Sequence, residues 1–202
     1  SLPMPERFIR SLGLVKAAAA RANAELGALD NKLAEAICAA ALRVAEGEYP
    51  EQFPVDVFQT GSGTSTNMNA NEVIAKLASE QLGHTVHPND EVNCSQSSND
   101  VIPTVIHVSA HMALEEQLLP ALHQLQHAIS RRESELTEQL KTGRTHLMDA
   151  LPIRFGQELS GWRAQLEMAE QRILDTRKRL CMLAQGGTAV GTGLLTAEGY
   201  AA

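Results

Sequence analysis

Apolar positions recur at helical spacing through the first part of the chain, and turn-forming residues divide them into segments. Residues 8–27 are rich in alanine, and Gly27 is predicted to end this helix because glycine readily adopts the left-handed conformation found at helix C-termini. Asp30 is predicted to cap a second helix that runs to about Glu46. Glycine and prolines within residues 47–54 then interrupt the pattern.

Two polar segments flank a third predicted helix. Residues 59–66 are small or hydroxylated and predict a loop, after which a helix is expected from about Asn67 to Gln81. Gly83 is predicted to end that helix. Residues 87–100 are dense in Asn, Ser and Asp, which predicts a second polar loop.

The second half of the chain has the pattern of long helices. An apolar stripe predicts a helix from Val101 to Leu140, about 60 Å long at the usual rise per residue, with Pro103 in its first turn and a kink at Pro120. After a predicted loop at residues 143–152, another long helix has apolar positions that alternate by four and three residues, as in helical bundles. This stripe consists of Phe155, Leu159, Trp162, Leu166, Ala169, Ile173, Thr176, Leu180 and Leu183. We expect the stripes to need partner helices, most simply from other copies of the chain.

These elements predict an all-α protein. A small helical N-terminal domain is expected at residues 1–96, followed at residues 97–202 by the first part of a central helical bundle. Composition supports this class, because hydrophobic residues make up 44% of the 202 residues while aromatic residues make up only 3%. Alanine and leucine favour helix packing, whereas β-sheets are enriched in aromatic and β-branched residues.

The net charge and the short apolar runs argue against two classes of partner, nucleic acids and membranes. The net charge of −7 argues against nucleic acid, which requires a clustered basic surface. No apolar run approaches the roughly 20 residues that span a bilayer, so no membrane partner is expected. The chain starts without the apolar core of a signal peptide, and its three cysteines form no CxxC pair. A reducing, cytoplasmic location is therefore expected.

The first candidate site is the segment from Gly61 to Asn67. Its two glycines and its hydroxyl groups directly precede a predicted helix, where backbone N–H groups and the positive end of the helix dipole favour a carboxylate or phosphate. A glycine loop with an ordinary N-cap explains the same residues, and the sequence leaves both interpretations open.

The second candidate site is the segment from Ser95 to Asp100, which opens the first long helix. One of its residues must cap that helix, but a single cap does not require so many polar residues together. An anion-binding cradle is therefore the alternative. Just upstream, His87 to Asp90 predict a turn.

The third candidate site lies at residues 141–149, between the two long helices. His146 can exchange a proton near neutral pH, and a nearby carboxylate such as Asp149 could fix its tautomer. A structural or solvated histidine is the alternative. His107 and His111 are four residues apart, but no acidic or cysteine ligands cluster beside them, so no metal is expected. Together the three segments suit a small polycarboxylate substrate and acid–base chemistry.

Five segments in this order resemble the class II fumarases of the fumarase/aspartase superfamily, and the resemblance covers nearly the whole chain. The segments are residues 57–73, 87–93, 95–100, 143–147 and 186–193. The resemblance implies an all-α fold and a homotetramer of the full-length protein, whose active sites each draw on three chains. It also implies reversible addition of water to fumarate, giving L-malate, as in the tricarboxylic acid cycle. No metal or organic cofactor is expected, and a mitochondrial matrix location would suit a eukaryotic source.

The resemblance assigns roles to individual residues. His146 would take part in acid–base catalysis, with activation of a water as one route. The residues implied to hold the substrate carboxylates are Ser62, Thr64, Ser97, Ser98, Asn99 and Thr145. A second, non-catalytic dicarboxylate site is implied at His87, Asn89 and Asp90.

One family motif has no counterpart in this chain. Class II fumarases carry a Gly-Ser-Ser-x-x-Met-Pro-x-Lys-x-Asn loop with the catalytic serine base, and these 202 residues contain no such pattern. The chain alone is therefore expected to be inactive. Aspartase is the enzymatic alternative, although aspartases tend to have alanine at the position of Ser62. A non-catalytic helical oligomerisation module is the other alternative.

Overall fold

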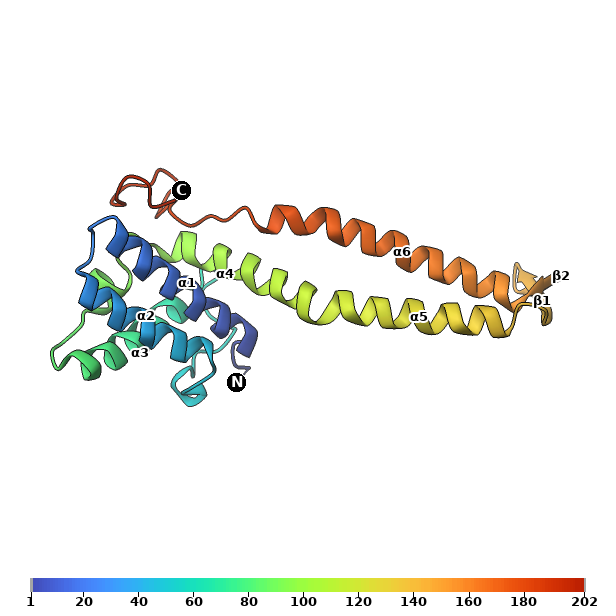
Figure 1. Ribbon diagram of the computed structural model, residues 1–202, viewed down its shortest axis with the longest axis horizontal. Coiled ribbons are helices and arrows are strands. Elements are labelled where there is room, and N and C mark those ends of the chain that lie inside the picture. The colour runs from blue at the N-terminus through green and yellow to red at the C-terminus, as the bar shows by residue number, and fades with distance from the viewer. Residues whose placement is uncertain (1, 202) are drawn as a thin grey trace. The chain divides into compact units, whose positions relative to one another are not determined.

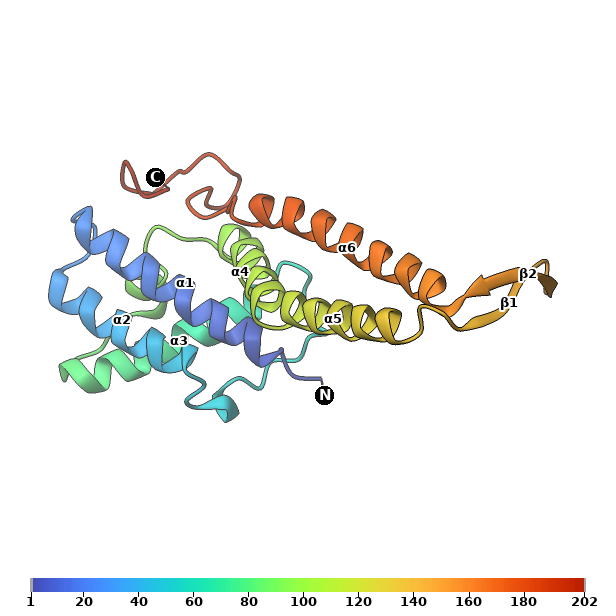
Figure 2. The ribbon, with the colours of Figure 1, turned by 45° about the vertical axis from the view of Figure 1, so that its right-hand side comes forward.

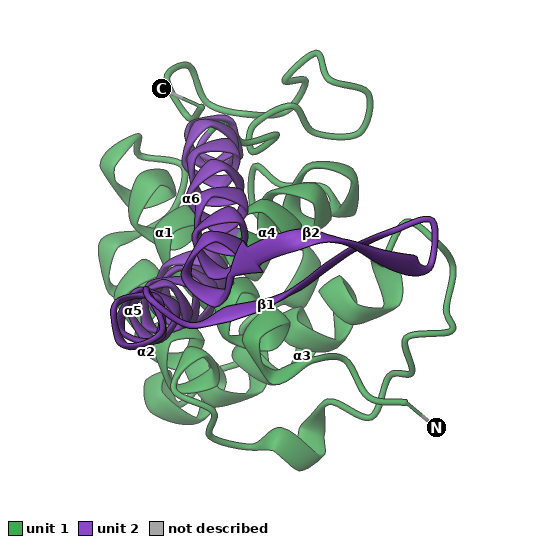
Figure 3. Ribbon diagram, turned by 90° about the vertical axis from the view of Figure 1, so that its right-hand side faces the viewer, with its two compact units in different colours: residues 1–110, 182–202 green, residues 111–181 purple. Residues whose placement is uncertain are grey.

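The computed structural model describes residues 2–201, and most of them are helical. The chain forms two compact units, residues 1–110 with 182–202, and residues 111–181 (Figure 3). The predicted all-α class is confirmed, with the addition of one small hairpin. These units are defined by contacts within the chain and divide it after residues 110 and 181. The domain boundary between residues 96 and 97 stays a prediction.

Three helices lie side by side in the first unit: α1 (Glu6–Glu25), α2 (Asn31–Ala45) and α3 (Thr64–Leu82) (Figure 1). Helices α1 and α2 cross closely at Gly13, where an added Cβ would lie 2.7 Å from both Ala41 O and Ala45 N. The largest fully buried apolar side chains of the core are Leu12, Ile37, Ile74, Val44, Val101 and Val105.

The helix ends follow the sequence signals. Gly27 (φ 72°) and Gly83 (φ 75°) both adopt the left-handed conformation directly at the ends of α1 and α3. Asp30 caps α2, because its Oδ1 accepts the N–H of Lys32 at 2.9 Å and that of Leu33 at 3.2 Å. These predictions are confirmed.

Helix α3 begins at Thr64, earlier than the predicted start at Asn67. Gly63 precedes the helix with φ 66°, and the side chain of Gln59 caps the first turn. Gln59 Oε1 accepts the Thr66 N–H at 3.1 Å, and Gln59 Nε2 donates to Thr66 Oγ1 at 2.7 Å. A side-chain cap supplied from outside the helix therefore extends it into the predicted loop. Between α2 and α3 lies a 3₁₀ turn, η1 (Pro50–Gln52).

The polar segment at residues 87–100 is only partly a loop. It contains the π-helical turn η2 (Pro88–Val92), and α4 (Ser98–Ala113) begins at Ser98 rather than at Val101. Ser97 accounts for this earlier start, since its Oγ accepts the Asn99 N–H at 3.2 Å and its own N–H donates to Asp100 Oδ1 at 2.9 Å. This reciprocal pair satisfies two backbone groups at the helix start.

The single long helix predicted from Val101 to Leu140 is divided. The π-helical turn η3 (Leu114–Leu118) separates α4 from α5 (Leu119–Glu135). Pro120 explains this turn, because proline offers no N–H and its ring crowds the carbonyl four residues earlier. The wider turn avoids that contact, and the Leu119 N–H donates to Leu114 O instead.

Helices α5 and α6 (Phe155–Leu180) lie side by side in the second unit (Figure 2). Side-chain pairs join them: Arg163 Nε donates to Glu133 at 2.9 Å, and His123 Nε2 lies 2.7 Å from Glu170. The α6 stripe is only partly covered within this unit: its leucines at 159, 166 and 180 are half-buried, and Trp162 is 52% exposed. The need for partner helices stays a prediction that this exposure supports.

Two strands occupy the segment predicted as a loop. Strands β1 (Leu140–Thr145) and β2 (Met148–Arg154) pair antiparallel beyond the end of α5 (Figure 2). The register shifts between Thr142 and Arg144, and a Cβ added to Gly143 would lie 2.6 Å from Leu151 O. Glycine therefore permits the close approach of the strands at this irregularity.

Among the described residues, the helices are too short or too polar to cross a membrane.

Candidate functional site

The start of α3 presents hydroxyl groups beside free backbone donors. Ser62 and Thr64 are exposed, and their Oγ and Oγ1 atoms lie 3.1 Å apart. The first N–H groups of a helix have no carbonyl partner within it, and they lie at the positive end of the helix dipole. This arrangement suits a carboxylate, which is one of the two interpretations that the sequence leaves open, and the cap itself comes from Gln59 rather than from these hydroxyls.

The start of α4 identifies which residue of the segment at 95–100 caps the helix, while the anion-binding cradle stays a prediction. Ser97 is the helix cap, so part of this segment has a structural role. Ser98 and Asn99 are not needed for that cap. Asn99 Nδ2 donates to Ala189 O at 2.9 Å and thereby contacts the glycine-rich segment at residues 186–193.

The two helix starts adjoin each other within the first unit. Asn67, in the first part of α3, donates from Nδ2 to Ser98 Oγ at 2.9 Å. A Cβ added to Gly63 would lie 3.0 Å from Ile102 Cγ1, so glycine allows α3 to begin directly against α4. The hydroxyls predicted from two separate motifs are thus presented by neighbouring helix N-termini.

Asp100 connects α4 to the glycine-rich segment. It is 1% exposed, and its Oδ2 accepts the N–H groups of Gly186 at 3.2 Å and Thr188 at 2.8 Å. Its Oδ1 accepts the Ser97 N–H. One buried carboxylate therefore holds both the start of α4 and a segment more than eighty residues later in the chain.

A buried polar network lies behind Ser98, and the sequence interpretation missed it. Lys16 of α1 is fully buried, and its Nζ donates to Asn93 Oδ1 at 2.8 Å and to Gln96 Oε1 at 3.0 Å. Burial lowers the pKa of Lys16 to about 7, while the nearby charge of Asp100 acts in the opposite direction. The sequence does contain a sign of this buried lysine. Lys16 lies four residues after Leu12, on the apolar face of the helix, where a charged side chain is unusual.

Thr145 and His146 lie at the tip of the hairpin in the second unit, and both are exposed. His146 (φ 53°) and Leu147 (φ 61°) form a two-residue turn in which both residues have positive φ. Such turns normally use Asn or Gly, and a branched residue like Leu147 is strained there. Strained backbone persists where the fold or function requires it, which makes this turn a candidate functional element.

The expected partner of His146 is engaged elsewhere. Asp149 Oδ1 accepts from Arg144 Nε at 3.2 Å, across the strand pair, so Asp149 does not fix the histidine tautomer as predicted. The His146 side chain is exposed at the tip of the hairpin. A hollow of about 710 Å³ lies along the same hairpin, and Lys141, Arg144 and Thr145 contribute to its lining.

The segment at His87 to Asp90 forms a compact turn. His87 Nδ1 accepts the Asp90 N–H at 3.2 Å and lies 3.3 Å from Asp90 Oδ2. Asn89 is exposed beside them. The turn predicted from the sequence is confirmed, and a second dicarboxylate site at His87, Asn89 and Asp90 stays a prediction.

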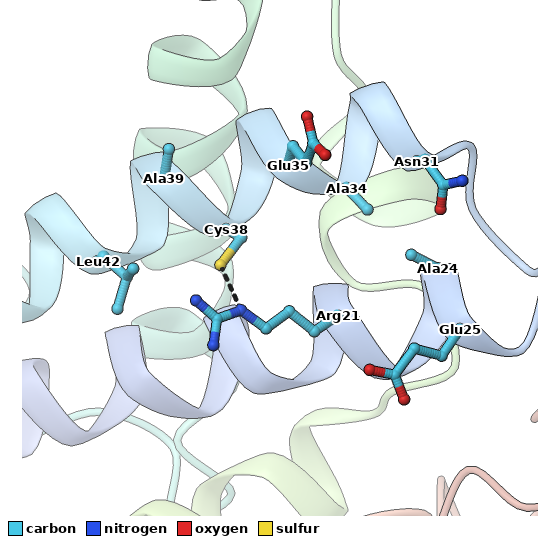
Figure 4. A pocket seen from close by; sticks show the side chains of 9 residues that line it. All are labelled: Arg21, Ala24, Glu25, Asn31, Ala34, Glu35, Cys38, Ala39 and Leu42. Atoms are coloured by element: carbon cyan, nitrogen blue, oxygen red, sulfur yellow. Dashed lines mark hydrogen bonds between the residues drawn. The ribbon is translucent and has the colours of Figure 1, made fainter.

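Two other kinds of candidate site, a metal site and a groove between helices, involve none of the residues predicted from the sequence. In the described part of the chain, no three His, Cys, Asp or Glu side chains group as metal ligands. A groove of about 400 Å³ between α1 and α2 is lined by residues outside the candidate segments (Figure 4). Arg21 Nε donates to Cys38 Sγ there at 3.2 Å, and Glu25 and Glu35 are also among the lining residues.

Comparison with known proteins places these segments in a wider context. The sequence model of the lyase family matches residues 3–202. The class II fumarate hydratase of Xylella fastidiosa (strain Temecula1) is 57% identical over 193 residues, covering 96% of this chain and 41% of that protein. A class II fumarate hydratase of Pseudomonas aeruginosa is 55% identical over 191 residues, covering 95% of this chain and 42% of that protein.

A fungal and a schistosome protein are also similar to this chain. The mitochondrial fumarate hydratase of Schizosaccharomyces pombe is 51% identical over 205 residues, which cover 98% of this chain and 39% of that protein. The crystal structure of class II fumarase from Schistosoma mansoni superimposes with a TM-score of 0.95 at 43% identity, covering 99% of this chain and 43% of the other. The chain thus spans about two fifths of the length of the curated relatives it matches.

Proposed function

Because the chain belongs to the lyase family, we propose that it supplies part of the active site of a fumarate hydratase. The reaction is the reversible addition of water to fumarate, giving L-malate. The observation that carries this proposal is the adjacency of the α3 and α4 starts, where Asn67 donates to Ser98 Oγ at 2.9 Å. Its support from outside the chain is the similarity to proteins named class II fumarate hydratase.

The reaction requires groups that stabilise a second negative charge on one carboxylate. In the dehydration direction, from malate to fumarate, a base removes a proton from C3 of malate, and the resulting aci-carboxylate dianion forms before hydroxide leaves C2. Neutral hydroxyl and amide donors that are already oriented stabilise this dianion without reorganisation during the reaction. The residues proposed to hold the two substrate carboxylates are Ser62, Thr64, Ser97, Ser98, Asn99 and Thr145.

His146 is proposed as the acid–base group of this chain. Its exposure at the hairpin tip leaves the imidazole accessible to a water or to another chain. The base that acts on C3 is expected in the Gly-Ser-Ser loop of the family, which these 202 residues do not contain. The chain therefore holds and orients substrate but does not complete the site alone.

The same proposal covers assembly and location. The half-exposed stripe of α6, including Trp162, suits packing against further copies of the chain in a homotetramer. Active sites that draw on three chains would combine the helix starts of one copy with Thr145 and His146 of another. His87, Asn89 and Asp90 are proposed as a second dicarboxylate site. The proposed location is the cytoplasm, or the mitochondrial matrix in a eukaryote.

A chimera tests the proposed activity directly. This chain replaces the matching two fifths of the Xylella fastidiosa fumarate hydratase, and loss of fumarate absorbance reports hydration. The chimera should convert fumarate to malate, while the 202-residue chain alone should not. A chimera that elutes with the same size as the parent enzyme yet lacks turnover would contradict the proposal.

Two alternatives give different outcomes in this assay. An aspartase would add ammonia rather than water to fumarate, so the same chimera is assayed with ammonium and the products are separated. A non-catalytic helical module would assemble but bind no dicarboxylate. The serine at position 62 favours the hydratase over the aspartase, because aspartases tend to have alanine there.

A further inference from the structure

Lys16 is a buried charge for which the proposed reaction has no direct use. It lies in α1, and its Nζ contacts Asn93 and Gln96, nearly eighty residues later in the chain. A buried ammonium group is costly unless it is paired or hydrogen-bonded. Leucine or methionine at this position would fill the core without that cost, so the amine performs some task beyond packing.

A chain of hydrogen bonds leads from Lys16 through Asn93 to Asn67, and the donor and acceptor of each bond can be assigned. In its charged form Lys16 can only donate, and Asn93 presents its oxygen, Oδ1, to it at 2.8 Å. The same oxygen then accepts from Asn67 Nδ2 at 3.3 Å and from Asn71 Nδ2 at 3.2 Å. Lys16 thus helps to fix the amide orientation of Asn93, together with the bond from Asn93 Nδ2 to Gln96 O at 3.1 Å, and Asn93 in turn orients Asn67.

The same chain of hydrogen bonds ends at the Ser98 hydroxyl. Asn67 is fully buried, and its Nδ2 donates to Ser98 Oγ at 2.9 Å as well as to Asn93. Both hydrogens of the Asn67 amide are therefore used, and Ser98 is the acceptor in the final bond. A hydroxyl that accepts from Asn67 must turn its own hydrogen elsewhere, which leaves Ser98 as a donor for a ligand oxygen.

We propose that Lys16 is a positioning residue that, through Asn93 and Asn67, orients the Ser98 hydroxyl as a donor toward a substrate carboxylate. This inference rests on the proposed function and adds residues that contact no substrate. Without the Lys16 donor, Asn93 Oδ1 loses its shortest hydrogen bond, and only the Asn93 Nδ2 bond to Gln96 O at 3.1 Å and the two asparagine donors hold that amide. Asn67 can then shift away from Ser98, and the Ser98 hydrogen can turn inward.

The test uses the chimera and compares KM with kcat. Lys16→Met fills the same volume without a donor, and we expect KM for fumarate to rise roughly tenfold, the loss typical of one hydrogen bond to a charged group. A change in kcat should be small, because the bond is present in both ground and transition states. A purely structural role would instead reduce the amount of active enzyme, and so kcat, without moving KM.

A double-mutant cycle identifies the route. If Lys16 acts through Ser98, Lys16→Met should raise KM in the unmodified chimera but have no further effect in a Ser98→Ala background. Lys76→Met is the matched control, since Lys76 is exposed and pairs only with Glu80 at 3.2 Å among the described residues. Additive effects of Lys16→Met and Ser98→Ala would overturn the proposal.

A second variant covers the case in which Lys16→Met does not fold. Asn67→Leu removes the last link of the same path and should give a similar rise in KM, again absent in the Ser98→Ala background. An unchanged KM for Asn67→Leu would overturn the proposal. Lack of turnover in the unmodified assembled chimera would instead contradict the proposed function, so the two failures are distinguishable.

Discussion

Asp100 Oδ2 accepts the backbone N–H of Thr188 at 2.8 Å, so a buried carboxylate at the start of α4 holds the glycine-rich segment at residues 186–193. The same side chain accepts N–H groups from Ser97 and Gly186. Three backbone donors on one carboxylate make Asp100 the point where the two segments are joined.

Asp100→Asn should destabilise the chain by roughly 3 kcal/mol, because an amide nitrogen would face backbone N–H groups and the charge-assisted bonds would be lost. Urea unfolding followed by circular dichroism measures this change. Asp175→Asn is the control, since Asp175 is exposed on α6. Equal stabilities of the two variants would show that Asp100 does not hold these segments together.

Gly13→Ala should destabilise the first unit by about 1–3 kcal/mol, as overpacking typically does. The added methyl group would lie 2.7 Å from Ala41 O and Ala45 N, and backbone atoms cannot move aside cheaply. Gly161→Ala is the matched control, because nothing lies within 4 Å of its Cβ position in α6. That substitution should instead stabilise by about 0.5–1 kcal/mol. Thermal unfolding of both variants separates the two effects, and a stabilising Gly13→Ala would refute the close crossing.

Lys16 should make stability depend on pH. Burial lowers its pKa from 10.5 to about 7 in the folded chain, so between these values the unfolded chain binds more protons. The free energy of unfolding should therefore rise with pH in this window, by at most about 1.4 kcal/mol per pH unit. Below about pH 7 both states are protonated, and Lys16 contributes no slope.

Lys16→Met removes this titration and should flatten the pH dependence between pH 7.5 and 9.5. Guanidinium unfolding at several pH values, for the original chain and the variant, measures the difference. Asp100 is the charged group that acts on Lys16, and it opposes the effect of burial. Parallel curves for the two proteins would mean that Lys16 keeps an ordinary pKa.

His146→Asn should lower turnover of the chimera by at least about a hundredfold, the usual scale for loss of a general acid or base. Asparagine tolerates the positive φ of position 146, so the hairpin turn is expected to remain. His84→Asn, at an exposed histidine outside the candidate segments, serves as control. Near-normal turnover of His146→Asn would remove this histidine from the mechanism.

Local signals in the sequence predict much of this fold. Gly27, Asp30 and Gly83 act through their own backbone or side chain, so their effects on α1, α2 and α3 can be inferred from neighbouring residues alone. The start of α3 was missed because Gln59 caps it from outside the helix. The turn at His146 was missed because it lacks the Asn-Gly signal of a two-residue hairpin.

The candidate site also contains residues that local motifs predict and residues that only distant contacts reveal. Ser62, Thr64, Ser98 and Asn99 follow from the small polar motifs that precede helices, and the structure joins those motifs through Asn67. The role of Lys16 depends on contacts across nearly eighty residues, which no local pattern specifies. The tautomer partner proposed for His146 failed because the strand register places Asp149 opposite Arg144.

The most direct test is a crystal structure of the chimera with succinate, an unreactive C4 diacid. We predict one carboxylate within about 2.6–3.2 Å of the Thr64 and Ser98 hydroxyls, with Thr145 of a second copy on the same molecule. Succinate bound away from these side chains, or absent at saturating concentration, would contradict the proposal that this chain builds a dicarboxylate site.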